Sequence, residues 1–237
     1  MALVASDVLN RVRTILQDTG STRWLLTELA DWLDDALLDI CFYKPTACSE
    51  AAVLDLVQGT QQTLPDNYTQ LLRVVRNITS DAASEPPRIG GPAITPIERE
   101  ILDAHVPGWH DSATVPQSAT VRHLMMDMMD PRTFYVYPGN DGTGRIEVLA
   151  AKQPQPITRP TDALAIEQYT DTLDIDPIYQ SAIMDFMLAR AFSKDMQFAG
   201  AAERAQLHFQ NYMNALGARQ QMEGQANVNT TQSQPNS

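Results

Sequence analysis

The sequence has few cysteines, few basic residues and no long apolar run. Its two cysteines, Cys41 and Cys48, do not begin a metal-ligand spacing, so we expect reduced or simply buried thiols rather than a disulfide or a zinc site. Lys and Arg total 17 against 29 Asp and Glu, and the net charge of −12 argues against a protein that coats nucleic acid non-specifically. No apolar run reaches the ~18 residues of a membrane span, and no signal-peptide pattern opens the chain, so we expect a cytoplasmic protein without a membrane partner.

The motifs of common active sites are also missing. The chain has no G-x-x-x-x-G-K-[ST], G-x-S-x-G or H-E-x-x-H, and the glycines of residues 139–144 do not follow the G-x-G-x-x-G order or open a helix. His105 and His110 lie five residues apart across a Pro-Gly break, so they share no helix face for a metal. We therefore expect no catalytic residues, no cofactor site and no metal site, and we do not expect an enzyme.

Apolar spacing and capping residues predict helices over about residues 6–19, 25–43, 96–105, 177–195 and 200–216. Thr95-Pro96-Ile97-Glu98 has the pattern of a capping box, and Asp176-Pro177 is a second helix start. The helical stripes predict that Trp32, Leu33, Phe186 and Phe209 are largely buried. Opposite them, Asp31, Asp34 and Asp35 are expected on a solvated face, where neutralising Asp34 or Asp35 should hardly matter.

The remaining regular segments have β character. Residues 53–78 form short runs broken by Gly59 and Pro65, which indicates three short strands or one β-arm. Residues 121–151 contain two alternating runs, at Phe134–Tyr137 and Ile146–Leu149, on either side of a loop rich in Gly, Asn and Asp. This pattern predicts a β-hairpin whose loop projects and serves as an interaction site rather than a nucleotide cradle.

The fold class predicted from these patterns is mainly α (α+β): a helical bundle with a projecting β-hairpin, a short β-arm and an extended C-terminal tail. We expect one domain over residues 1–217. Residues 218–237 are rich in Gln, Asn, Thr and Ser, and such a segment cannot bury enough apolar area to order itself alone.

Several short runs resemble a known protein family. The run Asp130–Pro138 followed by Asn140–Gly144 is similar to one found in head-to-tail adaptor (connector) proteins of short-tailed bacteriophages, the ring beneath the portal. Further pieces agree in order, and they are Arg11–Leu16 with Asp18 and Arg23-Trp24, Arg99–Ala104 with Trp109-His110, Val121–His123, and Ala191–Asp195 with Ala215–Gly217. The resemblance covers most of Val8–Gly217, and no single motif is specific by itself.

The resemblance implies a structural adaptor in the virion, at the head-tail junction, that is assembled in the host cytoplasm. It implies a homo-oligomeric, dodecameric ring that binds the portal protein and a tail or nozzle protein, and genomic DNA passes through its channel without specific binding. Two groups of interaction residues are expected, and they are Gly139, Asn140, Asp141, Gly142, Thr143 and Gly144 in the loop, with Gln220, Gln221, Asn227 and Asn229 in the tail. A DNA-packaging accessory or another tail structural protein is the alternative, and an enzyme of unrecognised class is the third hypothesis.

Overall fold

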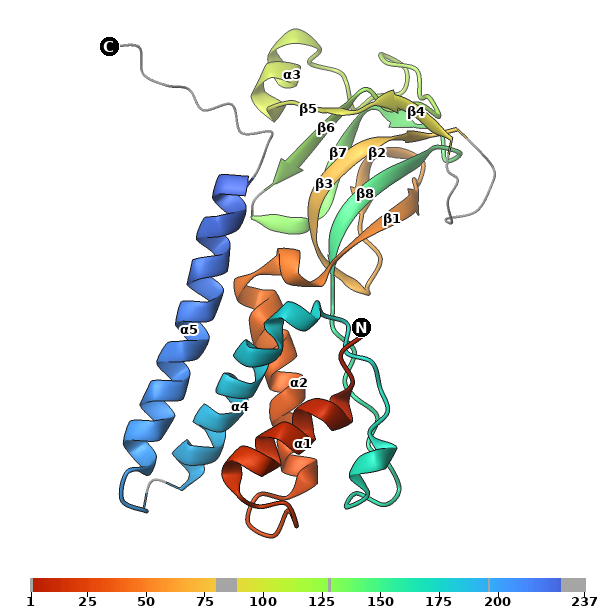
Figure 1. Ribbon diagram of the computed structural model, residues 1–237. Helices are drawn as coiled ribbons and strands as arrows, with labels where there is room; N and C mark the ends of the chain where they lie inside the picture. Colours follow the sequence, from red (N-terminus) through yellow and green to blue (C-terminus); the bar gives the residue numbers. More distant parts are fainter. Residues whose placement is uncertain (1, 80–88, 128, 196, 227–237) are drawn as a thin grey trace, which may run out of the picture. The chain divides into compact units, whose positions relative to one another are not determined.

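The computed structural model describes residues 2–79, 89–127, 129–195 and 197–226 of the chain. These residues form two compact units (Figure 1). The helical unit comprises the described residues up to Ala47 together with those from Pro154 onward, and the β unit comprises those from Cys48 to Gln153. The single domain expected over residues 1–217 is therefore built from two compact units, with the β unit inserted in the sequence of the helical unit.

The predicted fold class, a mainly α helical bundle with a projecting hairpin, is wrong. The chain is α+β, because 39% of it is helical and 27% is strand, and its described residues form five α-helices and two four-stranded sheets. The segment that was expected to be three short strands or one β-arm forms three strands. These strands pair with those of the expected hairpin, and together they share a core of their own. They are a second layered structure rather than an appendage of the bundle.

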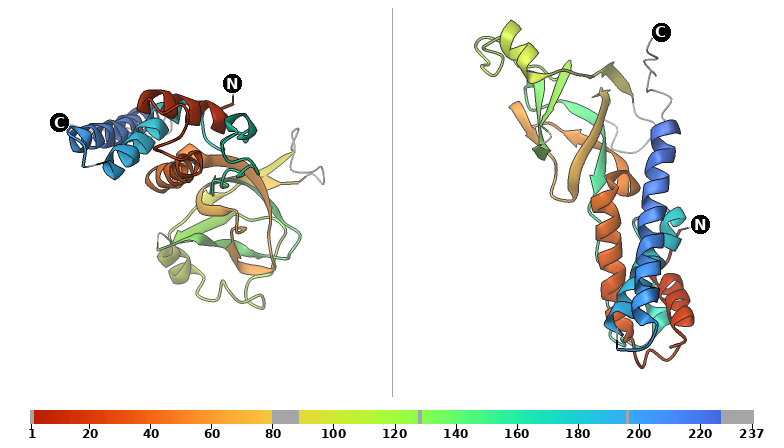
Figure 2. Two further views of the ribbon diagram at one scale, coloured as in Figure 1. Left: turned by 90° about the horizontal axis from the view of Figure 1, so that it is seen from below. Right: turned by 90° about the vertical axis from the view of Figure 1, so that its left-hand side faces the viewer.

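The helical unit contains α1 (Ala5–Leu16), α2 (Leu26–Tyr43), α4 (Gln180–Lys194) and α5 (Ala201–Ala226). Helix α4 packs against the other three, as Figures 1 and 2 show. The buried side chains recur every three or four residues, and they include Val8, Leu9 and Val12 of α1, Leu29, Leu33, Leu37 and Ile40 of α2, and Ile183, Phe186 and Met187 of α4. Burial of Leu33 and Phe186 confirms the predicted stripes, whereas Trp32 is only half-buried.

Helix α4 follows a long crossover that includes the short 3-10 helices η2 (Ile166–Gln168) and η3 (Pro177–Tyr179). Asp176 caps the start of η3, because the backbone N–H of Ile178 donates to its Oδ1 at 2.9 Å. Pro177 is the first residue of η3, where its missing N–H leaves no bond unmade. The cap-and-proline pair therefore acts as the sequence predicts, one turn before α4 begins.

Asp34 of α2 is not a solvated carboxylate, against the expectation for its face of the helix. Its Oδ1 accepts the backbone N–H of Ile157 at 2.9 Å, and its Oδ2 lies 2.8 Å from Nη2 of Arg159. The same guanidinium reaches Asp31 at 2.6 Å, and these two carboxylates raise the pKa of Arg159 although its partial burial acts in the opposite direction. Asp34 therefore ties the crossover that begins at Pro154 to α2.

Asp34→Ala is expected to lower the free energy of unfolding of the helical unit by about 2 kcal/mol, because it leaves the backbone N–H of Ile157 without its acceptor and removes one of the two carboxylates that pair with Arg159. Asp35→Ala is the matched control, since Asp35 is exposed one position along the same helix. Urea denaturation of both variants beside the parent measures the difference. Equal midpoints for the two variants would show that the carboxylate of Asp34 does not hold the crossover.

Helix α5 is longer and more exposed than the sequence suggests. It continues from Ala201 to Ala226, so residues 218–226 are helical although they were expected in the polar tail. Tyr212 and Leu216 are buried, but Phe209, predicted to be in the core, is 51% exposed. Helix α5 contacts α4 through a narrow strip of side chains. The seven-residue apolar pattern therefore predicts more buried residues on α5 than the structure has.

The β unit is a sandwich of two four-stranded sheets. The first sheet has the strand order β1 (Ser49–Asp55), β8 (Arg145–Lys152), β3 (Tyr68–Ile78), β4 (Gly90–Ala93), and the second has the order β2 (Gly59–Thr63), β7 (Asp130–Asn140), β6 (His123–Asp127), β5 (Thr95–Pro96). Inward side chains from both sheets form one core, and among them are Leu54, Leu71, Val74, Leu124, Phe134, Val136, Ile146 and Val148. The alternation of Phe134 and Val136 with Tyr135 and Tyr137 is thus the pleat of a strand with one buried face.

Strands β7 and β8 do not form the predicted hairpin. Strand β7 pairs with β2 and β6, whereas β8 pairs with β1 and β3, so the two strands belong to different sheets. The loop between them is the corner where the chain passes from one sheet to the other. Sequence alternation identifies strands but not their partners, and three of the partners here, β1, β2 and β3, come from distant parts of the chain.

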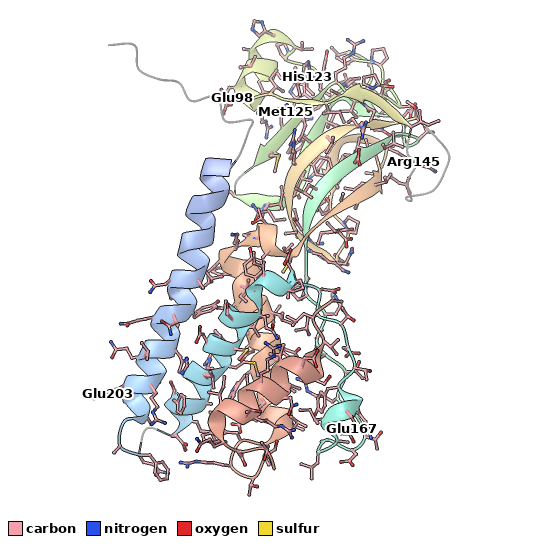
Figure 3. The ribbon with its side chains drawn as sticks, viewed as in Figure 1. Glu98, His123, Met125, Arg145, Glu167 and Glu203 are labelled. Atoms are coloured by element: carbon pink, nitrogen blue, oxygen red, sulfur yellow. The ribbon has the colours of Figure 1, made fainter. Side chains whose placement is uncertain are left out.

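A short helix, α3 (Arg99–His105), covers the outer face of the second sheet. The predicted capping box is wrong, because Thr95 and Pro96 pair with β6 as strand β5, and the helix begins after Glu98 (Figure 3). Trp109 is 1% exposed and its Nε1 donates to Asp103 at 2.7 Å, while Met125 and Tyr135 pack beside it. His110 stacks on Trp109, and burial lowers the pKa of its imidazole.

Cys41 and Cys48 are disulfide-bonded, which contradicts the expectation of reduced thiols. The 3-10 helix η1 (Pro45–Cys48) turns the chain immediately after α2, and a turn of that kind brings together cysteines that are close in sequence. Within the described part of the chain, no helix combines the length and apolarity needed to cross a membrane.

Candidate interaction site at the β7–β8 corner

The corner between the two sheets is organised by one buried side chain, Asn140. Asn140 is 0% exposed, and its Nδ2 donates to the carbonyl oxygens of Ser118 at 3.0 Å and Ala119 at 3.4 Å. Its Oδ1 accepts the backbone N–H groups of Gly142 at 2.8 Å and Gly144 at 3.1 Å. One amide thus satisfies backbone groups of the corner itself and of the neighbouring segment, as buried polar groups require.

Two glycines are required by this geometry. Gly142 has φ of +89°, a conformation that residues with a side chain rarely adopt. Gly144 has no room for a Cβ atom, which would collide with the side chain of Asn140 and the carbonyl oxygen of Ala119. The run Gly139–Gly144 therefore encodes a tight corner with an internal amide, and not a phosphate loop at the start of a helix.

The outer side of the corner presents Asp141 and Thr143 to solvent. The backbone N–H and the hydroxyl of Thr143 both donate to Asp141 Oδ1, at 2.9 Å and 2.6 Å. The hydroxyl of Thr143, with the neighbouring backbone N–H, lowers the pKa of Asp141. The corner therefore carries a fixed negative charge on a rigid support.

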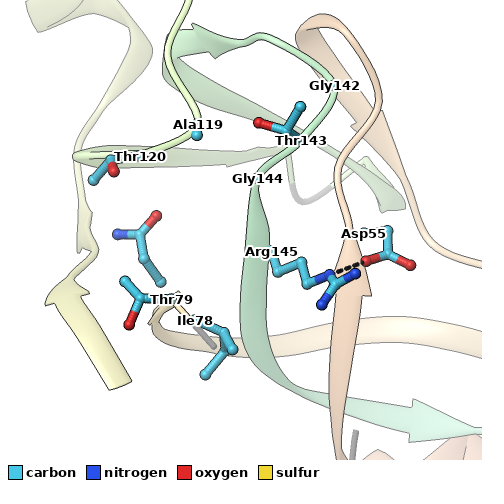
Figure 4. A pocket seen from close by; sticks show the side chains of 10 residues that line it. Asp55, Ile78, Thr79, Ala119, Thr120, Gly142, Thr143, Gly144 and Arg145 are labelled. Atoms are coloured by element: carbon cyan, nitrogen blue, oxygen red, sulfur yellow. Dashed lines mark hydrogen bonds and ion pairs between the residues drawn. The ribbon is translucent and has the colours of Figure 1, made fainter. Parts of the chain in front are cut away.

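The surface of the chain has hollows of about 440 Å³ and 560 Å³. The one of about 560 Å³ lies beside the corner. Figure 4 shows its wall, and the polar side chains that line it are Asp55, Asn77, Thr79, Thr120, Thr143 and Arg145. Arg145 Nε lies 2.8 Å from Asp55 Oδ1, so these two charges are paired. Asn77 is also committed, because it donates to Pro92 and Val121 and accepts the N–H of Val121.

The hollow offers hydroxyl groups and backbone carbonyls rather than reactive groups. In the described part of the chain, no three His, Cys, Asp or Glu side chains lie close enough to hold a metal ion. Hydroxyls on a rigid edge and one fixed carboxylate are suited to hydrogen bonds with a loop of another protein.

The structure does not bring the two predicted groups of site residues together in one unit. Residues Gly139–Gly144 form the corner of the β unit, whereas Gln220 and Gln221 lie in the last turns of α5, which belongs to the helical unit. Asn227 and Asn229 lie outside the described residues. Residues Gly139–Gly144 were selected as a projecting loop, but Asn140 and Gly144 are buried and only Asp141, Gly142 and Thr143 are exposed.

Sequence reasoning also missed a group of exposed apolar side chains on the helices. Phe42 and Tyr43 of α2 are 78% and 53% exposed, and Phe209 of α5 is 51% exposed. Large apolar side chains gathered on a surface mark contacts with other molecules. No local signal in the sequence separates these exposed aromatic side chains from the buried Tyr212 of α5.

Comparison with known families gives one match. The family model described as SU10 adaptor protein matches residues 5–234, which spans both units. No curated protein matches the chain.

Proposed function

Because the chain belongs to the SU10 adaptor protein family, a family of structural phage proteins, we propose that it is the head-to-tail adaptor of a short-tailed phage. In this role it forms a dodecameric ring that joins the portal to the tail and continues the DNA channel. The observation that carries the proposal is the family match over residues 5–234. The site at the corner agrees with it, because it offers a contact surface.

The charge of the chain supports a conduit for DNA. A net charge of −12 gives the surface a predominantly negative potential, which repels phosphates and lets DNA slide past without being held. A DNA-packaging accessory that binds DNA would instead need a basic face. A gel-shift experiment with the purified chain separates the two roles, and we expect no shift at physiological salt.

The corner is the proposed contact for the tail machinery or a neighbouring subunit. Its support is rigid, since Asn140 fixes the backbone from the inside, and its exposed tip offers Asp141 and Thr143. Loops held on a rigid scaffold are where contacts with partners concentrate.

The end of the chain is the proposed contact for the portal. Gln220 and Gln221 follow Tyr212 and Leu216, which are buried, in α5, and residues 227–237 add further amide side chains. Polar segments with few large apolar groups gain order when they make many hydrogen bonds to a partner. The resemblance to short-tailed phage adaptors assigns this segment to the portal.

Removal of the segment after Gly217 is expected to weaken binding to portal rings at least tenfold, because it removes Gln220, Gln221, Asn227 and Asn229 together. A second truncation after Ala226 keeps α5 whole and reports on residues 227–237 alone. Binding of both to purified portal rings is measured beside the full chain by light scattering and surface plasmon resonance. Thermal melting is the control, since Tyr212 and Leu216 remain in both variants. Equal affinity of all three chains would refute the portal contact.

A further inference from the structure

The helical unit has a groove where α2, α4 and α5 meet, with a volume of about 440 Å³. Its apolar wall is formed by Tyr43, Phe186 and Phe209. Tyr43 and Phe209 are about half-exposed, while Phe186 forms the floor at 6% exposure. Aromatic side chains in a concave site are the residues that most often anchor a protein partner.

The groove also carries a positive charge. Arg190 of α4 is exposed, and its guanidinium carbon lies 5.2 Å from the ring centre of Phe186. In the part of the chain that the structure describes, Arg190 forms no ion pair. The other charged lining residue is Asp39, whose carboxylate accepts the hydroxyl of Tyr212. Arg190 is therefore the charge that the groove offers to an occupant.

The same unit carries a knob of complementary character, which comprises residues 162–168. Leu164 is 66% exposed at its tip, and the exposed carboxylates of Asp162 and Glu167 lie on either side of it in the sequence. Glu167 forms no ion pair with any residue that the structure describes. The knob thus presents one apolar side chain together with free negative charge.

The knob is preformed rather than flexible. The backbone N–H of Leu164 donates to Asp162 Oδ1 at 3.1 Å, and the N–H of Ala165 donates to the Asp162 carbonyl at 3.1 Å. The buried Tyr169, which is 1% exposed, supports the knob, because its hydroxyl donates to the Ala163 carbonyl at 3.3 Å. A rigid knob loses little conformational entropy when it docks.

Helix α5, which forms one wall of the groove, lies on the opposite side of the helical unit from the knob (Figures 1 and 3). Figures 1 and 2 show α5 on one side of this unit and the segment around Glu167 on the other, with α1, α2 and α4 between them. Two different complementary patches on opposite sides of one subunit generate a head-to-tail contact, which closes into a ring when the rotation permits. A second copy of the chain is therefore the occupant that the placement and the charges favour.

We propose that the 162–168 knob of one copy docks in the α2–α4–α5 groove of the next, with Leu164 against Phe186 and Phe209 and with Glu167 at Arg190. This interface rests on the proposed ring function and names the surfaces that build the ring. It also accounts for the exposure of Phe209, which gains an apolar partner only in the assembly.

A charge exchange tests the pairing. Arg190→Glu alone and Glu167→Arg alone are each expected to weaken assembly at least tenfold, because each places like charges together. A mixture of the two variants is expected to assemble again, since the groove of one then receives the knob of the other with opposite charge. The double variant Arg190→Glu/Glu167→Arg should assemble for the same reason. Recovery in the mixture shows that position 190 of one copy faces position 167 of another, and a mass above that of a dimer shows that the contact is head-to-tail.

The matched controls are Glu203→Arg, at a residue labelled in Figure 3, and Arg204→Glu. They make the same charge changes on exposed residues of α5 that do not line the groove. Assembly is measured as mass by light scattering, for the full chain alone and with purified portal rings, and melting temperatures confirm that all variants fold. A parent chain that stays monomeric in both conditions would overturn the ring and the interface together. If the parent assembles and the single variants assemble equally well, only the interface is overturned. Loss in the single variants without recovery in the mixture overturns it too, because the two positions then do not face each other.

Discussion

Asn140→Ala is expected to lower the free energy of unfolding of the β unit by about 3–5 kcal/mol, because four backbone groups lose their partners and a buried side-chain volume is left empty. The Gly142 and Gly144 N–H groups and the Ser118 and Ala119 carbonyls all depend on this one amide. Since single-domain stabilities are about 5–15 kcal/mol, such a loss threatens the whole unit. The corner is thus a structural centre of the β unit, whatever contacts it makes.

Hydrogen exchange of peptides from residues 118–148, read by mass spectrometry across a urea series, measures this loss within the β unit. Asn140→Asp keeps an oxygen that accepts from Gly142 and Gly144, but its second carboxylate oxygen replaces the Nδ2 donor and faces the carbonyl oxygens of Ser118 and Ala119, so a loss at least as large is expected at neutral pH. Thr143→Ala is the control, because it changes an exposed side chain of the same corner. If Asn140→Ala and Thr143→Ala exchanged alike, the amide would have no role in holding the corner.

The same residue shows where sequence reasoning reached its limit. The Gly, Asn and Asp content of residues 139–144 indicates a chain reversal, and the alternation on both sides indicates strands. A hairpin and a corner between two sheets share these features, because local sequence is the same whether the next strand pairs with the previous one or with distant strands. Only the pairing of β7 with β2 and of β8 with β3, both far away in sequence, separates the two.

The positions of the helices were easier to predict from the sequence, because the apolar periodicity and the residues that end a helix are both local features. The stripe of α2 predicted the burial of Leu33, and Asp176 caps the segment before α4. The errors arose where a tertiary partner decided the outcome. Thr95 and Pro96 became strand β5 because β6 lies beside them, and Asp34 became an anchor because the crossover passes over α2.

For the candidate contact residues too, the sequence predicts local features but not those that depend on tertiary partners. Residues 139–144 could be selected from their composition, but their buried and exposed members could not be told apart without the position of Ser118 and Ala119. The groove and the knob could not be found at all, because each joins residues from different parts of the chain or depends on exposure. The groove takes Tyr43 from α2, Arg190 from α4 and Phe209 from α5.

Tyr212→Ala is expected to lower the free energy of unfolding of the helical unit by about 3–5 kcal/mol and to release α5 from α2 and α4. Tyr212 is 0% exposed, its ring meets the ring of Phe186 edge-on at 5.3 Å, and its hydroxyl donates to Asp39. Few other side chains of the described part of α5 are buried, chiefly Ala201 and Leu216, so no neighbour can replace this anchor. Hydrogen exchange should therefore show rapid exchange throughout α5 before the rest of the unit opens.

The hydroxyl of Tyr212 makes a separate, pH-dependent contribution to the free energy of unfolding. Burial, together with the carboxylate of Asp39, raises the pKa of Tyr212 far above its usual value of 10. Above pH 10 the unfolded chain loses this proton while the folded chain keeps it, so the contribution to stability is complete below pH 10 and decreases as the pH rises. Tyr212→Phe should accordingly cost about 1 kcal/mol at neutral pH and should show a shallower alkaline decline than the parent.

Phe209→Ala is the matched control for Tyr212→Ala on the same helix. Phe209 is 51% exposed, so its removal should change the melting temperature little, although it removes an apolar contact of the proposed ring interface. Tyr212→Ala should impair both folding and assembly, whereas Phe209→Ala should impair assembly alone. If the two variants lost equal stability, α5 would be held by its whole apolar surface and not by the strip around Tyr212.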